Sequence, residues 1–343
     1  MDALDVKSVT CAPERGTSEP TVIDEQQPKE EEGLGKRPQF GNRYLTDKGR
    51  VFEHNAWDNV QWSEEQLEAA RQKVAEVAAF KADEQIQAHY ETEAANYWNQ
   101  FYGIHTNRFF KDRNWLFVEF PELLPENQPT ELTAEPQQSE TCEEFVGQHA
   151  AFRIYEIGCG VGNTILPILE TNKNPALYIY GSDFSSKAVD VLTENEAFDE
   201  SRCTVFVDDA AAPEWSTPFP KASIDLIICV FVMSAISPCR FKNIVRQSWE
   251  YLKPGGLVLF RDYGRFDMAQ LRFKKGKCLE DNFYVRGDGT RCYFFTQEEL
   301  SQLFTSAGFV EELNHVDRRL QVNRGRQLEM YRIWIQCKFR KPK

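Results

Sequence analysis

The sequence predicts an α/β fold, with a doubly wound, mostly parallel sheet and a late antiparallel hairpin. From residue 151 onward, short apolar strands alternate with amphipathic helices, which is the pattern of a sheet covered by helices on both faces. The first strand of this region runs directly into a glycine-rich loop. Two late strand patterns flank Asn323-Arg324-Gly325, and this spacing is typical of a hairpin turn.

Each element follows from its local pattern. A helix is expected to begin after Thr296, because Thr296 and Glu299 form a capping box, and to end at Gly308. The five strands of the sheet are expected at residues 152–157, 177–182, 203–207, 224–231 and 256–261, and the hairpin strands at about 313–322 and 328–338.

The chain divides into four regions. Residues 1–38 are rich in Pro, Glu, Thr and Ser and are expected to form a disordered acidic tail. Residues 39–125 are expected to be helical, because Ser63 and Gln66 cap a stretch rich in Ala, Glu and Gln that predicts one long helix, or two with a break. Residues 126–150 predict a flexible linker, and residues 151–343 form the α/β domain.

Composition excludes several classes of protein. The longest largely apolar run, 226–236, is shorter than the ~20 residues that a membrane span needs. Nine cysteines occur without a CxxC spacing, and no secretory signal is recognised, so we expect reduced thiols, an intracellular protein and no metal site. The acidic start favours a cytoplasmic over a mitochondrial location, and a nuclear fraction is compatible with it.

Charge is distributed unevenly along the chain. The net charge of −13 disfavours contact with a polyanion. However, residues 1–35 hold nine acids and three bases, whereas residues 36–50 hold five bases and one acid, and residues 313–343 hold nine bases and two acids. Because the local field steers a polyanion, the two basic regions leave nucleic-acid binding open.

The strongest motif is a glycine-rich loop that follows the first expected strand, with the sequence Gly158-Cys159-Gly160-Val161-Gly162-Asn163. Its glycines permit a tight turn and close approach of a ligand to the backbone, and the next helix offers free N–H groups. The spacing differs from the G-x-G-x-x-G of dinucleotide binders, and Glu156 stands two residues before the first glycine. This combination favours S-adenosylmethionine over NAD.

Three acids and an aromatic residue stand at strand ends that face the same crevice. Asp183 lies 21 residues past Gly162, where an acid would accept hydrogen bonds from ribose hydroxyls, or would cap the next helix. Phe184 could lie on the adenine ring. Asp208 and Asp209 end the third strand, where a purine amino group would be met, although solvated acids at a strand end are the plainer alternative.

Two further segments carry chemistry or packing. Arg261-Asp262-Tyr263-Gly264 follows a buried strand and reaches the same crevice, although a structural Arg–Asp pair is nearly as good an explanation. Residues 283–295 interleave aromatics with Arg286 and Arg291 around a tight turn. Aromatics stack on exposed bases and arginines meet phosphates, but half of these aromatics are expected in the core.

These motifs together resemble one family, the class I, S-adenosylmethionine-dependent tRNA N3-methylcytidine methyltransferases of the methyltransferase-like group. The resemblance covers residues 40–125 and 151–340, and the segment His54-Asn55-Ala56-Trp57-Asp58 is similar to the branch acting on threonine and arginine tRNAs. Two positions depart from the pattern: Asp209 stands where relatives carry an apolar residue, and Arg240 follows Cys239 where they carry a Lys after a polar residue. Further matching segments are Phe109-Phe110-Lys111-Asp112-Arg113, the glycine loop with Thr164, Asp183-Phe184-Ser185, Ser234-Ala235-Ile236, Arg261–Gly264 and Asn282–Arg286.

The resemblance implies methylation of cytidine 32 in the tRNA anticodon loop, with no metal, no membrane and, for some tRNAs, an auxiliary anticodon-binding-domain protein. It makes residues 39–125 a tRNA-binding region and 151–343 the methyltransferase domain. The expected cofactor contacts are Glu156, Gly158, Gly160, Gly162, Asn163, Asp183, Phe184, Asp208 and Asp209. The expected catalytic residues are Asp262, Asp208 and Tyr263. The expected RNA contacts are Arg43, Lys48, Arg50, Trp57, Lys111, Arg113, Arg286, Arg318, Arg319, Arg324 and Arg326.

Two other functions remain open from the residues alone. A methyltransferase of a protein or small molecule would not need basic termini and would keep its activity at high salt. A non-catalytic partner of an RNA enzyme would not bind the cofactor, which the intact glycine loop and Asp183 disfavour.

Overall fold

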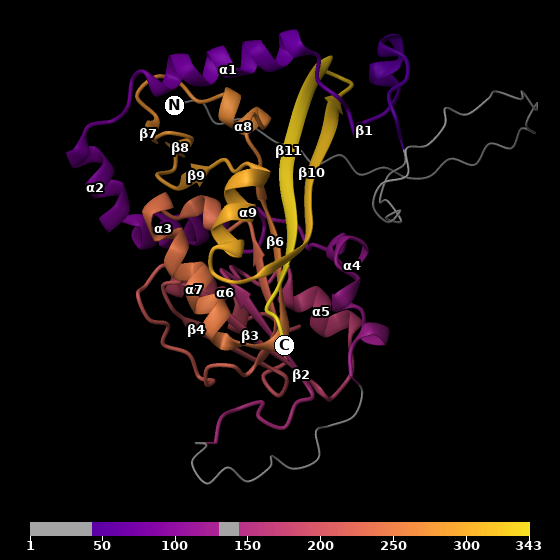
Figure 1. The fold of residues 1–343 in the computed structure, drawn as a ribbon, viewed down its shortest axis with the longest axis vertical. Helices are drawn as coiled ribbons and strands as arrows, with labels where there is room; N and C mark the ends of the chain where they lie inside the picture. Colours follow the sequence, from indigo (N-terminus) through magenta and orange to yellow (C-terminus); the bar gives the residue numbers. More distant parts are fainter. Residues whose placement is uncertain (1–42, 130–143) are drawn as a thin grey trace, which may run out of the picture. The chain divides into compact units, whose positions relative to one another are not determined.

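An eight-stranded mixed sheet organises the chain (Figure 1). The computed structural model describes residues 43–129 and 144–343, so the expected acidic tail and the centre of the expected linker lie outside the described residues. The strand order is β1-β10-β11-β6-β5-β2-β3-β4. These strands are β1 (Ala56–Asp58), β2 (Phe152–Ile157), β3 (Leu177–Asp183), β4 (Cys203–Val207), β5 (Ile224–Val230), β6 (Leu252–Tyr263), β10 (Val310–Asn323) and β11 (Leu328–Arg340).

The sheet confirms the predicted fold class. Strands β4, β3, β2, β5 and β6 are mutually parallel, and β11, β10 and β1 add to the edge in antiparallel fashion. The chain order reverses between β2 and β5, so the loops after these strands diverge and leave a crevice at their carboxyl ends. The hairpin β10–β11 and strand β6 are longer than the sequence pattern indicated.

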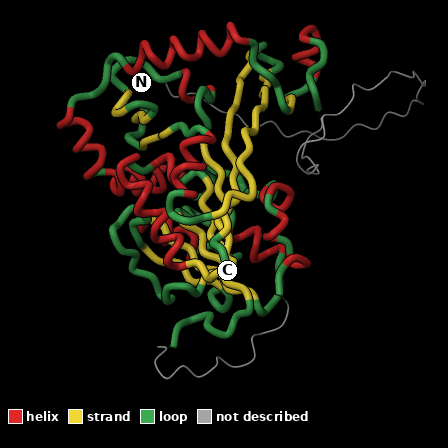
Figure 2. Tube along the Cα trace, viewed as in Figure 1, coloured by secondary structure: helices red, strands yellow, loops and turns green. Residues whose placement is uncertain are grey.

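Helices cover both faces of the sheet (Figure 2). One buried cluster includes Ile168 of α5 and Leu192 of α6 with the apolar side chains of β2, β3 and β5. The other includes Ile244 of α7 and Phe304 of α9. These helices are α5 (Ile165–Thr171), α6 (Ser186–Thr193), α7 (Phe241–Tyr251) and α9 (Gln297–Thr305), and the predicted Thr296 capping box is present.

The N-terminal region contains three principal helices rather than the one or two predicted. They are α1 (Glu64–Ala78), α2 (Glu84–Thr92) and α3 (Ala94–His105). The break after α1 has a local cause, because the Asp83 side chain accepts a hydrogen bond from Ile86 N (2.9 Å) and starts a new helix. Short helices complete this region: η1 (Lys48–Glu53), α4 (Leu116–Glu119), η2 (Pro121–Leu123) and η3 (Pro125–Asn127).

A second, three-stranded sheet was not predicted. It contains β7 (Cys278–Glu280), β8 (Phe283–Val285) and β9 (Arg291–Tyr293), and α8 (Met268–Leu271) precedes it. Helix α1 contacts both α8 and β7, and Gln66 at its start lies 3.4 Å from the Tyr331 hydroxyl of the long hairpin. Thus α1 spans from the hairpin to the small sheet (Figure 1). Two 3₁₀ turns, η4 (Met233–Ala235) and η5 (Pro238–Arg240), follow β5.

The two described ends of the predicted linker pack against the domain. The Asn172 side chain donates to Gln128 Oε1 (2.7 Å), and the Tyr180 hydroxyl donates to the carbonyl of Val146. None of the helices in the described part is long and apolar enough to cross a bilayer.

Candidate active site

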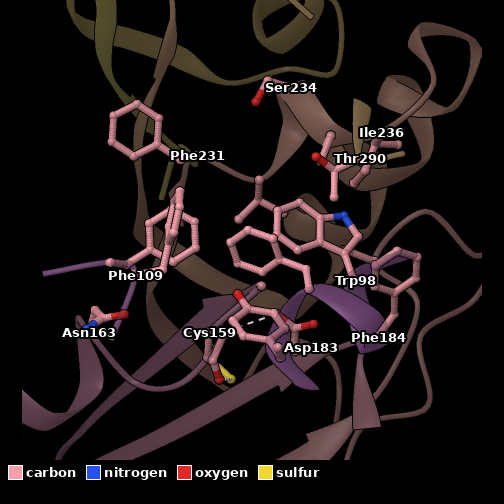
Figure 3. A pocket seen from close by; sticks show the side chains of 18 of the residues that line it. Trp98, Phe109, Cys159, Asn163, Asp183, Phe184, Phe231, Ser234, Ile236 and Thr290 are labelled. Carbon is pink, nitrogen blue, oxygen red and sulfur yellow. Dashed lines mark hydrogen bonds between the residues drawn. The ribbon is translucent and has the colours of Figure 1, made fainter. Parts of the chain in front are cut away.

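A cavity of about 450 Å³ lies at the carboxyl ends of β2, β3, β4 and β5 (Figure 3). Its walls come from five separate parts of the chain: the loops after these strands, the end of β6, helix α3 with residues 106–115, the turn between β8 and β9, and strand β11. The volume falls in the range typical of small-molecule sites. Figure 3 shows Asp183 and Phe184 on one side of the cavity and Ser234 and Thr290 on the opposite side. We call these the β3–β4 end and the β8–β9 end.

Carboxylates dominate the β3–β4 end. Asp183 accepts from Gly160 N and Ser185 N, both at 2.9 Å, and its burial raises the pKa of this carboxyl to about 6. Asp208 accepts from Ser216 N (3.3 Å) through one oxygen, while its other oxygen, Oδ2, is buried without a partner in the described structure. Such an orphaned acceptor indicates a ligand with a hydrogen-bond donor at this place.

Asp209 forms an ion pair with Arg240, the other residue that departs from the family pattern. Arg240 of η5 lies 3.4 Å from Asp209 and 3.1 Å from Glu91 of α2. The two departures from the family pattern are therefore an ion pair beside the cavity. Asp209 still lines the cavity, together with Phe184, as expected.

The glycine loop forms the floor of the cavity. Gly158 and Gly160 line it and have φ values of 64° and 52°, which favour glycine. A Cβ at Gly160 would meet the Tyr102 hydroxyl at 2.6 Å. Gly162 does not line the cavity and instead packs against Leu192, so it serves the packing of helix and strand.

Glu156 also lies beneath the loop rather than in the cavity. Its carboxylate is 3.6 Å from the Arg113 guanidinium, and burial raises its pKa to about 8. Arg113, expected to contact RNA, points inward because it also donates to Thr164 Oγ1 (3.0 Å). The expectation for Arg113 is corrected accordingly: it docks residues 106–115 onto the glycine loop. Asn163 completes this contact, because its amide donates to Asp112 (3.0 Å).

Aromatic residues from the N-terminal region cover the cavity, a feature that the sequence analysis missed. Trp98, Phe101 and Tyr102 of α3 form a mutually packed cluster, with ring centroids 5.3–5.8 Å apart. Phe109 and Phe110 extend this cluster, and Lys111 stands at its edge as an exposed lining residue. The signal was visible as the aromatic runs at 97–102 and 108–115, but their contact with the glycine loop depends on the tertiary fold.

The β8–β9 end combines aromatics, cations and one acid. Tyr263, at the end of β6, lines it as expected, and its ring lies 5.7 Å from the Arg286 guanidinium carbon. Arg286 donates through Nη1 to Arg291 O (3.0 Å). Arg332 is paired with Asp267 (2.8 Å) and lies over Trp334. Phe231 follows β5, lines the cavity and has a φ of 60°, a strained value for an aromatic residue. Backbone strain of this kind is concentrated at functional sites.

Asp262 does not reach the cavity, so its expected contact with substrate is wrong. The residue is fully buried, and its two carboxylate oxygens accept from Ser234 N (2.9 Å) and Tyr263 N (2.8 Å). Burial raises its pKa to about 6. Asp262 therefore fixes the loop after β5, and the charge expected from it must come from another residue.

Two predicted RNA contacts are structural. Trp57 is buried beside Leu320 and Val322, and its indole N–H donates to Val51 O (2.8 Å), so it cannot stack on a base. Arg319 lies in a half-buried network with carboxylates of Asp317 (3.0 Å) and Glu119 (3.5 Å). A cation held by several carboxylates is not available for phosphate, so the expectation for Arg319 is corrected as well.

The remaining cations that were predicted to contact RNA differ in how exposed they are and in whether they are paired. Arg43, Lys48 and Arg326 are exposed. Arg50 is exposed but paired with Glu53 (2.8 Å). Arg318 is half-buried, and desolvation lowers the pKa of its guanidinium, whereas Arg324 is exposed and donates to Phe52 O (3.1 Å).

The loop between α8 and β7 carries cations that the sequence analysis did not select. Arg272, Lys274 and Lys275 are exposed and Lys277 is half-buried, and none of the four has an ion-pair partner within the described residues. Lys275 lies over the ring of the exposed Phe80 (4.3 Å). The run Arg272-Phe273-Lys274-Lys275-Gly276-Lys277 could have been found by charge patterning alone. Across residues 43–129 and 144–343, no group of three or more His, Cys, Asp or Glu side chains is placed to hold a metal ion.

The doubly wound sheet, the glycine loop at its switch point and the acid at the end of β3 define a class I, S-adenosylmethionine-dependent methyltransferase. Comparison with known proteins agrees: a methyltransferase domain family matches residues 105–312. A solved S-adenosylmethionine-dependent methyltransferase from Methanosarcina mazei is 18% identical, with a TM-score of 0.42, over 55% of this chain and 92% of its own.

Closer relatives specify the family. The tRNA N(3)-cytidine methyltransferase METTL2 of Xenopus tropicalis is 54% identical, over 90% of this chain and 96% of its own length. The tRNA N(3)-methylcytidine methyltransferase trm140 of Schizosaccharomyces pombe is 43% identical, over 88% of this chain and 92% of its own. The chain belongs to the tRNA N(3)-cytidine methyltransferase family, as the sequence motifs predicted.

Proposed function

We propose that this protein transfers the methyl group of S-adenosylmethionine to N3 of cytidine 32 in the anticodon loop of tRNA. The observation that carries the proposal is the cavity, which places a set of groups suited to adenosine at one end and a separate polar and aromatic end beside it. The names of the relatives supply the tRNA and the N3 atom. Position 32 comes from the family resemblance.

The residues of the β3–β4 end fit the cofactor. Asp183 would accept from the ribose hydroxyls, and the unpartnered oxygen of Asp208 would accept from the adenine amino group. Phe184 and Trp98 supply apolar surface for the adenine ring. When bound, S-adenosylmethionine supplies an electrophilic methyl group.

The remaining task of the protein is positioning. Cytosine N3 carries a neutral lone pair at physiological pH, so no general base is required. Holding the base in line with the methyl group and excluding water can supply about 7–11 kcal/mol of the barrier. The aromatic cover from α3 and residues 106–115 excludes water, and the strained Phe231 presents a ring beside Tyr263 (5.2 Å). The N3 atom lies on the Watson–Crick edge, so the target must be unpaired, as in an anticodon loop.

The electrostatic surface supports RNA as the substrate. Because the net charge of −13 repels tRNA at a distance, binding requires local cations whose contacts release counterions. The unpaired cations of 272–277 and Lys111 meet this requirement better than the hairpin residues, of which Arg319 is held by carboxylates. We therefore place the RNA on the side of the molecule formed by α1, the loop 272–277 and the mouth of the cavity.

The proposal is tested with the purified full-length protein, S-adenosylmethionine and tRNA transcripts. Nucleoside mass spectrometry should detect N3-methylcytidine in a threonine or arginine tRNA. A product methylated at another atom, or methyl transfer only to protein or small molecules, would contradict the proposal. Adding an anticodon-binding-domain protein tests the proposed auxiliary partner, which should raise the rate on some of the tRNAs. Microscopy of the tagged protein should show it in the cytoplasm.

A further inference from the structure

One acid lines the β8–β9 end of the cavity. Of the carboxylates that line it, Asp183, Asp208 and Asp209 follow β3 and β4 and lie with the cofactor groups. Asp288 belongs instead to the turn between β8 and β9. Since Asp262 is buried outside the cavity, Asp288 is the lining carboxylate that the described structure offers to the substrate.

The turn holds Asp288 in a fixed position. Its Oδ1 accepts from Thr290 N (2.9 Å) and from the Thr290 hydroxyl (2.7 Å). Gly289 has a φ of 83°, and a Cβ there would clash with the Tyr97 ring, so the turn is also packed closely against α3. The other oxygen, Oδ2, has no hydrogen-bond partner among residues 43–129 and 144–343. The carboxylate is thus oriented through one oxygen and open through the other.

Arg286 on the same turn has hydrogen-bond donors that are not used, as Asp288 has an acceptor that is not used. Its Nη1 donates to Arg291 O (3.0 Å) and approaches the Thr290 hydroxyl (3.4 Å), while Nε and Nη2 have no hydrogen-bond partner in the described residues. It forms no ion pair there either, although Asp288 is only two residues away. An acid and a base that line one cavity without pairing leave an acceptor and a donor for a ligand.

We infer that Asp288 accepts a hydrogen bond from the N4 amino group of the target cytosine, selects cytosine over uracil, and stabilises the methylated product. The inference rests on the proposed function. Arg286 would donate to the O2 carbonyl. Cytosine carries a donor at N4 and an acceptor at O2, on either side of N3, whereas uracil presents an acceptor, O4, where Asp288 needs a donor. Two acceptors that face each other repel, and this repulsion disfavours uracil.

The charge balance of the reaction favours a carboxylate at this place. A bond forms between cytosine N3 and the methyl carbon, the carbon–sulfur bond breaks, and its electron pair remains on sulfur. No proton is lost, so the positive charge passes from the sulfonium to the base and spreads onto the N4 amino group. A fixed carboxylate at N4 interacts more strongly with this cation than with the neutral substrate, which is the condition for lowering the barrier.

Steady-state kinetics of the Asp288→Asn variant test the inference. The amide oxygen keeps both bonds from Thr290, so the melting temperature should stay within ~2 °C of wild type. Loss of the charge should lower kcat about 10- to 100-fold, because hydrogen bonds to charged groups are worth this much. The Kd values for S-adenosylhomocysteine and for tRNA should change by less than about twofold. Asp190→Asn, a matched exposed carboxylate on α6, should leave all four quantities unchanged.

Competition binding gives a readout that does not depend on turnover. With S-adenosylhomocysteine bound, the wild type should bind a C32U transcript more weakly than the C32 transcript, and Asp288→Asn should reduce this difference, because its amide can donate to O4. Wild-type kcat in Asp288→Asn, or an unchanged C32/C32U difference, would overturn the inference while N3-methylcytidine formation by the wild type upholds the proposed function. If the wild type forms no N3-methylcytidine, the proposed function itself fails.

Discussion

The two ends of the cavity are built in different ways. At the β3–β4 end, the glycine loop, Asp183, Phe184 and Asp208 all follow strands of one sheet. At the β8–β9 end, Tyr263 is the last residue of β6, Arg286 and Asp288 lie on a turn of the second sheet, and Trp334 comes from β11. The cofactor end is therefore built from neighbouring strand ends of one sheet, whereas the substrate end combines strands of that sheet with a turn of the second sheet. Evolution can vary the second end without disturbing the first.

The largest expected effect concerns the cofactor end. Asp183→Ala removes the charged acceptor for the ribose hydroxyls and leaves Gly160 N and Ser185 N unpaired. We expect S-adenosylhomocysteine to bind about 10- to 100-fold more weakly by calorimetry, as for the loss of hydrogen bonds to a charged group. Binding of tRNA should be unchanged. Unaltered cofactor affinity in a folded variant would remove Asp183 from the site.

The same residue predicts a pH dependence. Burial raises the pKa of Asp183 to about 6, and the ribose hydroxyls need the ionised form as acceptor. Affinity for S-adenosylhomocysteine should therefore be constant above about pH 7 and fall as the pH drops through 6. In Asp183→Asn the affinity should be weaker but independent of pH over this interval. A wild-type profile that is flat from pH 7 to pH 5 would contradict the assignment.

The next effect concerns protein stability and the ion-pair network around Arg319. Arg319→Ala leaves the carboxylates of Asp317 and Glu119 without this cation, and breaking such a buried network costs about 3 kcal/mol. Thermal denaturation should show a loss of several degrees, and the salt dependence of tRNA binding should keep its slope. If the slope of the salt dependence changed while the melting temperature did not, Arg319 would be a contact to RNA and not a structural residue.

For the loop 272–277 we expect the reverse of the Arg319 result: weaker tRNA binding without a loss of stability. Replacing Arg272, Lys274 and Lys275 with Ala should weaken tRNA binding about 10-fold and flatten its salt dependence, because up to three phosphate contacts are lost. The melting temperature and cofactor affinity should not change. Neutralising Arg324 and Arg326 at the hairpin turn is the matched comparison, and filter binding across a salt series should show the smaller change there.

The smallest expected effect is a difference in stability between alanine substitutions at two glycines. Gly160→Ala introduces a Cβ 2.6 Å from the Tyr102 hydroxyl at a φ of 52°, which should cost about 1 kcal/mol and weaken cofactor binding. Gly103→Ala lies in α3 with nothing within 4 Å of the new Cβ and should stabilise the protein by about 0.5–1 kcal/mol. Denaturant titrations should give these opposite signs; equal signs would show that the glycine loop is not constrained as described.

The contrast between the two ends also explains what the sequence could predict. The sheet, the glycine loop and Asp183 follow from local periodicity and from spacing along one chain segment, so they were predicted at their correct positions. The inward turn of Arg113, the burial of Trp57 and the carboxylates around Arg319 depend on contacts between segments that lie far apart in the sequence. Sequence spacing carries no information about such contacts. Asp262 was misplaced for a similar reason, because the end of a buried strand predicts proximity to the crevice but not which side chain enters it.

Mapping the methyl group in tRNA shows whether the protein modifies C32. A threonine tRNA transcript, its C32U counterpart and the purified protein are incubated with S-adenosylmethionine, and ribonuclease fragments are weighed by mass spectrometry. We expect one additional methyl group on the anticodon-loop fragment that contains C32, as N3-methylcytidine, and none on the C32U transcript. A methyl group on any other fragment, or methylation of the C32U loop to the same extent, would contradict this expectation.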